Sequence, residues 1–238
     1  LPILLHNDGK FTPSICDPEK DIALLQYTGG TTGVPKGAML SHQNISANTR
    51  QINLIDPQSR LVKPQDPGED RILGVLPFFH VFANATVLNR TVNNDGEIIM
   101  LPRFEAVAAL AAVNRAKVTS MPGVPTMYQA LLDNPALHDT DFQRLRACIS
   151  GGAPLPAELK RRFEEFTGAR VIEGYGLTES SGVVSCNPYE GVNKLGSIGQ
   201  AVPGTRIRLL DKEDPSKPAK AGEPGELAFA GPQVMCGY

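Results

Sequence analysis

The chain has 238 residues, of which 41% are hydrophobic, and a net charge of −2 with an isoelectric point near 6.1. This length and apolar content suit a globular chain with a sizeable core. The nearly balanced charge, without long blocks of like sign, gives no electrostatic footprint for nucleic acid, so we expect no DNA or RNA partner. The four cysteines lie far apart and form no CxxC pair. That spacing argues against a disulfide framework or a zinc site and fits a reducing, cytoplasmic compartment.

The first segment with a chemical pattern is the loop from Tyr27 to Gly37, which reads YTGGTTGVPKG. The apolar run at 22–25 predicts a buried strand before it, and the run at 38–40 predicts a strand after it. Glycines let backbone N–H groups approach an anion, threonines add hydroxyl donors, and Lys36 adds a positive charge. The small residues are Thr28, Gly29, Gly30, Thr31, Thr32 and Gly33. We therefore predict a polyphosphate site, although a Gly/Thr-rich turn alone is also ordinary surface punctuation.

This loop differs from two other phosphate-binding patterns. A Walker A loop needs Gly-Lys-Ser/Thr, whereas Lys36 lies between Pro35 and Gly37, and the Gly-x-Gly-x-x-Gly fingerprint is absent from the loop. A P-loop NTPase and a dinucleotide-binding unit are both disfavoured.

Helices and strands then alternate along the chain. Ser41 predicts the cap of a helix that ends before Asp56, and a proline-rich loop covers 56–70. Strands are predicted at 71–76, 97–101, 117–121, 147–149 and from 171; helices are predicted at 81–92, 105–115, 124–132 and 156–167. Among the helical residues expected to face the core are Val107, Leu110, Ala111, Leu159, Phe163 and Phe166. The alternation predicts an α/β fold with a mostly parallel, doubly wound sheet flanked by helices, and ligands at the carboxyl ends of its strands.

Two short segments that follow predicted strands carry candidate pocket residues. His80 follows the strand at 71–76, but a lone histidine beside aromatics such as Phe79 is more often a packed core residue than a catalyst. The segment 150–156 reads SGGAPLP and is a helix-entry turn. Its small residues, Gly151, Gly152 and Ala153, also permit the close approach of a ligand.

The segment 173–179, EGYGLTE, is predicted to be a glycine-bearing turn and has the most specific pattern after the phosphate loop. Tyr175 offers a flat face for a base, and Gly174 and Gly176 let the backbone come close to it. Thr178 can donate to a phosphate, and Glu179 is a hard oxygen ligand suited to Mg²⁺. For either of these last two residues singly, a surface turn with a solvated side chain is the competing interpretation.

The pattern changes after residue 191 to short strands without helices, at 204–210 and 225–230. We expect three regions: an extended lead-in at 1–20, an α/β core at 21–190, and the start of a β-rich subdomain at 191–238. Because the chain opens on Leu1 without a methionine and stops at Tyr238 after a predicted strand, we expect an internal piece of a longer protein.

These motifs together resemble the adenylate-forming superfamily of acyl-CoA synthetases, luciferases and peptide-synthetase adenylation domains. The resemblance extends from about residue 21 to 238, and the segments 25–27, 37–42 and 231–235 resemble a bacterial long-chain-fatty-acid-CoA ligase. It implies an ATP- and Mg²⁺-dependent conversion of a fatty acid to an acyl-adenylate, followed by transfer to coenzyme A. Its partners would be these small molecules, while a homodimer and a peripheral contact with the inner face of a membrane stay open.

The resemblance also implies roles for the candidate residues. Lys36, Thr178 and Glu179 would be catalytic, with Glu179 holding Mg²⁺. The nucleotide would contact 28–33, Lys36, 151–153, 174–176 and Thr178, and the acyl pocket would include Phe79, His80, Gly151 and Gly176. The ribose-binding aspartate, the hinge and the catalytic lysine of the family's mobile C-terminal lid domain would follow Tyr238, so we expect this chain alone to complete neither half-reaction efficiently. A coumarate-CoA-ligase-like or luciferase-like enzyme and a catalytically silent nucleotide-binding module are the alternatives.

Overall fold

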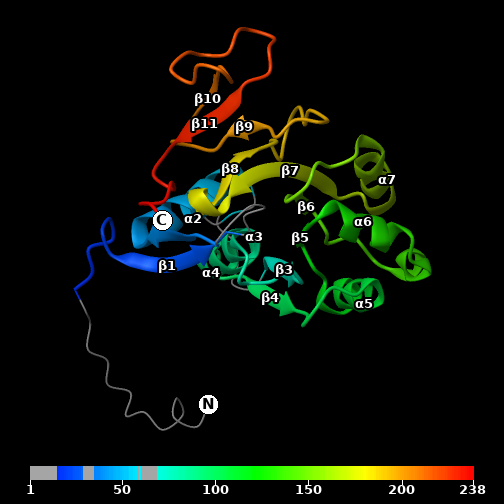
Figure 1. Ribbon diagram of the computed structural model, residues 1–238. Helices are drawn as coiled ribbons and strands as arrows, with labels where there is room; N and C mark the ends of the chain where they lie inside the picture. The colour runs from blue at the N-terminus through cyan, green and yellow to red at the C-terminus, as the bar shows by residue number, and fades with distance from the viewer. Residues whose placement is uncertain (1–14, 29–34, 58, 60–68) are drawn as a thin grey trace.

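The computed structural model describes residues 15–28, 35–57, 59 and 69–238. A seven-stranded sheet in the order β4-β3-β5-β6-β7-β8-β9 forms its centre (Figure 1). Its strands are β3 (Arg71–Gly74), β4 (Glu97–Met100), β5 (Ser120–Gly123), β6 (Ala147–Ser150), β7 (Arg170–Leu177), β8 (Gly182–Cys186) and β9 (Gln200–Ala201). The first five strands in this order are parallel and the last two are antiparallel. The predicted α/β class with a mostly parallel sheet is confirmed.

Helices flank this sheet, as Figure 1 shows. A row of three helices contacts along one side: α5 (Ala106–Ala116), α6 (Pro125–Leu132) and α7 (Ala157–Thr167). Elsewhere lie α2 (His42–Ile55) and a continuous helical stretch made of α3 (Val81–Ala83), the π-helical η1 (Asn84–Asn89) and α4 (Arg90–Asn93). A short 3₁₀ turn, η2 (Pro135–Asp139), follows α6. The single hydroxyl proton of the fully buried Tyr128 of α6 is shared between the carbonyls of Met121 (2.9 Å) and Ile149 (3.0 Å), so this side chain contacts both β5 and β6.

The predicted core faces of two helices need correction. Leu110 is buried in α5, but Val107 is 54% exposed and Ala111 is also exposed. The buried residues of this helix are Ala109, Leu110, Ala112 and Val113. An alanine-rich helix offers little contrast in side-chain size, so the apolar pattern did not fix its orientation. In α7, Leu159 and Phe163 are buried as predicted, whereas Phe166 is 40% exposed and packs edge-on against His138 and Phe142.

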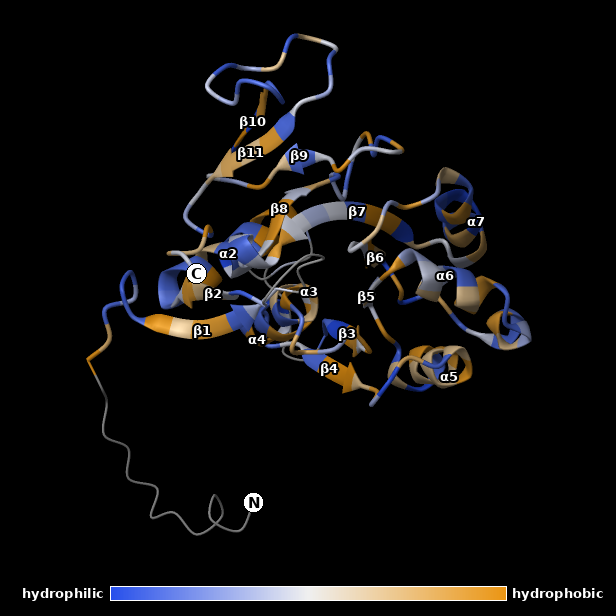
Figure 2. Cartoon of the chain, in the orientation of Figure 1, coloured by the Kyte–Doolittle hydropathy of each residue, from blue (hydrophilic) through white to orange (hydrophobic). Residues whose placement is uncertain are grey.

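The strands beside the predicted phosphate loop form a separate antiparallel pair, β1 (Ile22–Tyr27) with β2 (Gly37–Ser41). The strand predicted at 22–25 is confirmed, but its predicted burial is wrong, because Ile22 is 40% exposed and Leu25 is 57% exposed. Figure 2 shows the hydrophobic first part of β1 at the periphery of the molecule. Within the described part of the chain, β1 pairs only with β2 and is not part of the central sheet. In contrast, Ala38 and Leu40 of β2 are buried.

The segment 173–179 is largely strand, although the sequence indicated a turn. β7 continues to Leu177 and pairs with β8, a strand that sequence analysis did not predict, with an irregularity between Tyr175 and Gly176. A Cβ on Gly176 would lie 1.7 Å from the carbonyl oxygen of Gly182, so this glycine is required by the close approach of the two backbones. The strand predicted at 117–121 begins only at Ser120, because Lys117 adopts a left-handed conformation (φ 52°) that ends α5.

The two predicted strands after residue 191 are confirmed as the hairpin β10 (Arg206–Leu210) and β11 (Glu226–Ala230). Polar side chains of α2 hold the segments that flank it. Gln51 donates to the carbonyl of Pro203 at 2.8 Å and to Oε1 of the fully buried Gln233 at 3.1 Å. Ser41 caps α2 as predicted, in a capping box with Asn44.

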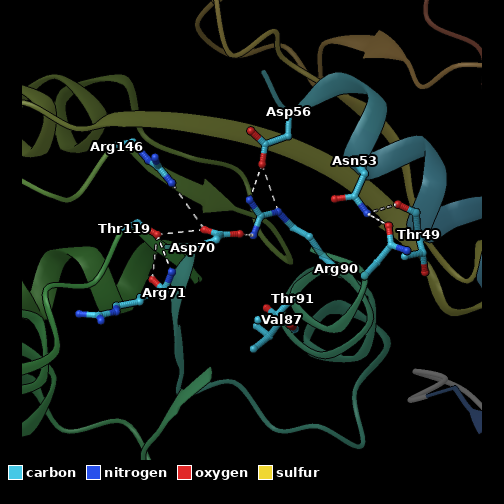
Figure 3. Close-up of polar contacts among 11 residues, drawn as sticks. Thr49, Asn53, Asp56, Asp70, Arg71, Val87, Arg90, Thr91, Thr119 and Arg146 are labelled. Carbon is cyan, nitrogen blue, oxygen red and sulfur yellow. Dashed lines mark hydrogen bonds and ion pairs between the residues drawn. The ribbon is translucent and has the colours of Figure 1, made fainter. Parts of the chain in front are cut away.

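A buried ion-pair network lies at the amino ends of the parallel strands (Figure 3). The guanidinium of Arg90 contacts the carboxylates of Asp56 and Asp70, the latter at 2.7 Å, and all three side chains are at most 3% exposed. Thr119 donates a 2.9 Å hydrogen bond to Asp70. The charge of Arg90 is therefore balanced by two carboxylates, and Asp70 gains a further hydrogen bond from Thr119.

Candidate active site

The topology of the sheet directs attention to the carboxyl ends of β3, β5 and β6. The strand that follows β3 in sequence, β4, lies on one side of it, and β5 lies on the other. Such a reversal of strand order opens a crevice at the carboxyl ends, where α/β sheets bind ligands. The segments 75–82 and 151–156 leave the sheet at this edge.

A mostly apolar cavity of about 70 Å³ brings the three predicted segments together. Among its lining residues are six that the sequence singled out: His80, Gly151, Gly152, Gly174, Tyr175 and Gly176. Phe82, Ile149 and Val183 add apolar wall. Residues nearly one hundred positions apart therefore share one small hollow.

The two candidate residues after β3 differ in their placement. His80 is exposed, lines the cavity and caps the helix that follows, since its Nδ1 accepts a 3.1 Å hydrogen bond from the backbone N–H of Phe82. Phe79 is 80% exposed, and its side chain does not line the cavity. Its carbonyl instead accepts a 2.5 Å hydrogen bond from Gln26 of β1. Neither residue is the packed core residue that aromatic neighbours usually indicate.

Glu173 fixes the segment 151–155 relative to β7, a role that sequence analysis missed. Its Oε1 accepts a 3.0 Å hydrogen bond from the backbone N–H of Leu155. Gly152 adopts φ +77°, a conformation that favours glycine, and Ala153 beside it is exposed. The available signal was the acidic residue at the start of EGYG, which can pair with an N–H at a helix entry.

Lys36 and Glu179 come together on one tyrosine. The Nζ of Lys36 lies 5.0 Å from the ring centroid of Tyr238, and the Tyr238 hydroxyl donates a 2.8 Å hydrogen bond to Oε1 of Glu179. This carboxylate raises the pKa of the Tyr238 phenol. Thr178 and Glu179 begin the short turn η3 (Thr178–Ser180) directly after β7. Sequence analysis gave Tyr238 no role, and its only signal was its place in the 231–238 segment.

The phosphate loop itself is described only at its ends. Gly29, Gly30, Thr31, Thr32 and Gly33 lie outside the described residues. The backbone N–H of Thr28 donates to the carbonyl of Lys36 at 2.9 Å, which brings the two ends of the loop together. Lys36 therefore lies directly at the end of the β1–β2 pair.

A magnesium ion that arrives with a nucleotide fits the available donors. Across the described residues, no three His, Cys, Asp or Glu side chains are grouped as a metal site. The half-buried Glu179 contributes one carboxylate beside Lys36. Mg²⁺ typically takes one or two protein carboxylates together with substrate phosphates, so a single acid suffices. In the same described ranges, no helix combines the length and apolar character needed to cross a membrane.

Sequence relatives agree with the motifs. The chain is 44% identical over 222 residues to a long-chain-fatty-acid-CoA ligase of Bacillus subtilis, which covers 93% of this chain and 38% of that protein. It is 37% identical over 219 residues to a feruloyl-CoA synthase of an Amycolatopsis species, covering 92% of this chain and 42% of that protein.

Solved structures agree with the fold. The structure of ATP-bound MatB from Rhodopseudomonas palustris superposes with a TM-score of 0.83 at 35% sequence identity. The match covers 94% of this chain and 42% of the MatB chain. The structure of a long-chain-fatty-acid-CoA ligase, FadD1, from Archaeoglobus fulgidus superposes with a TM-score of 0.86 at 26% sequence identity. The match covers 100% of this chain and 47% of the FadD1 chain. The chain thus spans less than half the length of these four proteins. A family model described as AMP-binding enzyme matches residues 5–238, and the chain belongs to that family of adenylate-forming enzymes.

Proposed function

We propose that the protein containing this chain activates a long-chain fatty acid with ATP and transfers the acyl group to coenzyme A. The observation that carries the proposal is the meeting of Lys36 and Glu179 on Tyr238, at the end of the strand whose glycines line the cavity. A cation, an acid and a small apolar hollow are the features that a nucleotide-dependent activation of a carboxylic acid requires. The long-chain fatty acid is proposed from the 44% identity to the Bacillus subtilis ligase.

In the first half-reaction, an oxygen of the fatty acid carboxylate attacks the α-phosphorus of ATP, and the bond to pyrophosphate breaks. Lys36 would offset the charge of the leaving pyrophosphate, and Thr178 would donate to an α-phosphate oxygen. Glu179 would hold Mg²⁺, which supplies further charge neutralisation when bound. These contributions are positioning and electrostatics, with no covalent protein nucleophile.

In the second half-reaction, the coenzyme A sulfur attacks the acyl carbon, the thiol loses its proton, and the bond from that carbon to AMP breaks. Tyr175 would face the adenine ring, while Gly151, Gly152 and Gly176 would let the adenylate lie against the backbone. His80 would form part of the pocket wall beside the acyl group.

A smaller aromatic acid is the second candidate substrate, and the cavity is smaller than either acid. Its volume of about 70 Å³ is well below the ~300–1,000 Å³ of typical ligand pockets. The described residues therefore enclose room for the head of a substrate. The 37% identity to a feruloyl-CoA synthase supports the same alternative.

The test is acyl-adenylate formation by the full-length protein, measured as pyrophosphate release with palmitate, shorter fatty acids and ferulate. We expect palmitate to be used best, and Lys36→Ala and Glu179→Ala to lower the rate about 10²- to 10³-fold, as loss of a charge-stabilising group does. Lys212→Ala and Glu213→Ala remove exposed charges of the same kind from the β10–β11 connection and serve as matched controls. A preference for ferulate would make the aromatic acid the proposed substrate in place of a long-chain fatty acid. Unchanged rates in Lys36→Ala and Glu179→Ala would contradict the roles proposed for these two residues.

A further inference from the structure

Three segments that are distant in sequence are joined by backbone hydrogen bonds around Glu179. The N–H of Met235 donates to the carbonyl of Glu179 at 2.8 Å. On the other side, Met39 of β2 donates to the carbonyl of Gly237 at 2.8 Å and accepts from Cys236 at 2.9 Å. Since β2 begins directly after Lys36, the segment 235–238 bridges the two parts of the site.

The side chain of Tyr238 completes this bridge. Its hydroxyl donates to Oε1 of Glu179 at 2.8 Å, and the face of its ring lies 5.0 Å from Nζ of Lys36. Cations are attracted to the face of an aromatic ring, and a phenol hydrogen bond fixes the orientation of a carboxylate. One side chain therefore contacts both charged groups.

Among the described residues, Lys36 and Glu179 form no ion pair, although both contact the same ring system. A directly paired lysine and glutamate would neutralise each other and would have to separate before binding phosphate and cation. Because each group contacts Tyr238 instead, Lys36 can meet a phosphate while Glu179 meets a cation.

We propose that Tyr238 is a positioning residue of the nucleotide site, which orients the Glu179 carboxylate toward a magnesium ion and holds Lys36 apart from it. The inference rests on the proposed function, because it assigns these two residues to a magnesium-bound nucleotide. It predicts separate contributions from the hydroxyl and the ring. The hydroxyl acts on Glu179 and hence on the magnesium dependence, and the ring acts on Lys36 and hence on nucleotide binding without metal.

Two variants of the full-length protein separate these contributions. Tyr238→Phe removes the hydroxyl and keeps the ring, and Tyr238→Leu removes both. The measurement is ATP binding by calorimetry across a series of Mg²⁺ concentrations and in EDTA. Tyr189→Phe removes a buried phenol hydroxyl from the pocket at the amino ends of the strands and serves as the control.

We expect Tyr238→Phe to raise the Mg²⁺ concentration for half-maximal binding about tenfold, the scale of lost partners of a metal ligand, without changing the affinity in EDTA. Tyr238→Leu should do the same and also weaken binding in EDTA about threefold. An unchanged Mg²⁺ dependence in Tyr238→Phe, or equal losses with Mg²⁺ and in EDTA, would overturn the inference. A wild-type protein that binds no ATP with Mg²⁺ would instead overturn the proposed function from which it starts.

Discussion

The two ends of the parallel sheet carry similar charged side chains in opposite circumstances. At the amino ends, Arg90 is enclosed with Asp56 and Asp70, and none of the three side chains is more than 3% exposed (Figure 3). At the carboxyl ends, Lys36 is exposed and Glu179 is half-buried, and both contact Tyr238. The charged groups at the amino ends form ion pairs with each other, while Lys36 and Glu179 at the carboxyl ends remain accessible to a ligand.

This difference indicates what each group of charges does. Burial alone would lower the pKa of Arg90, but the two neighbouring carboxylates raise it, so the guanidinium stays charged at every accessible pH. We therefore expect this buried cation, which neutralises two carboxylates, to stabilise the folded state. Lys36 and Glu179 are not enclosed in this way, so we expect them to act mainly on ligand binding.

The largest expected effect comes from breaking the buried network. Arg90→Met removes the cation shared by Asp56 and Asp70, and we expect the free energy of unfolding to fall by about 3–5 kcal/mol, the range for buried charges that lose a partner. Urea unfolding, monitored by circular dichroism, measures this change in unfolding free energy. Adding Asp56→Asn and Asp70→Asn to Arg90→Met should recover part of the loss, because the uncompensated charges are then gone. A loss below about 1 kcal/mol, typical of surface pairs, would mean that the network does not stabilise the fold.

The second effect tests the strand that forms the site at the carboxyl ends. Gly176→Ala would place a Cβ 1.7 Å from the carbonyl oxygen of Gly182, and backbone must move to relieve the clash. We expect a loss of about 1–3 kcal/mol in unfolding free energy, as overpacking usually costs. Gly174→Ala, two residues earlier in β7, is the matched stability control, because its Cβ would meet ordinary contacts at 3.5 Å or more. Equal stability of both variants would show that β7 and β8 can separate without cost.

The sequence predicted well those features that depend on neighbouring residues. Ser41 was identified as a helix cap from the residues that follow it, and the order of apolar runs predicted the parallel sheet. The glycines of 173–179 were interpreted as a turn, because the pairing with β8 that makes them strand residues is not local. The exposure of β1 also depends on what covers it, which an apolar run does not reveal.

Contacts across long sequence separations account for the unpredicted parts of the site. Tyr238 reaches a glutamate 59 positions earlier, and Arg90 reaches an aspartate 34 positions earlier. A residue pattern within a short window carries no information on such pairs. The candidate residues could be predicted in part because glycine, threonine, lysine and glutamate in short motifs suggest phosphate chemistry, whereas a tyrosine at the same site has many other uses.

The smallest expected effect comes from an arginine that, like Arg90, contacts two carboxylates, but at the surface. Arg161 of α7 bridges Glu158 at 2.6 Å and Glu165 at 2.7 Å, but its side chain is 55% exposed. Solvent screens this pair of contacts, so we expect Arg161→Ala to shift the midpoint of thermal unfolding by no more than the error of the measurement.

The pH dependence gives this prediction its sign. The hydrogen bond from Arg161 lowers the pKa of Glu158, so any stabilisation is present above the pKa of the unfolded glutamate and is lost as the pH falls through the lower folded value. Unfolding scans of wild type and Arg161→Ala should therefore differ, if at all, at neutral pH and low salt, and should coincide in acid or at high salt. A loss at neutral pH as large as that of Arg90→Met would show that bridging two acids, and not burial, is what makes an arginine structural in this fold.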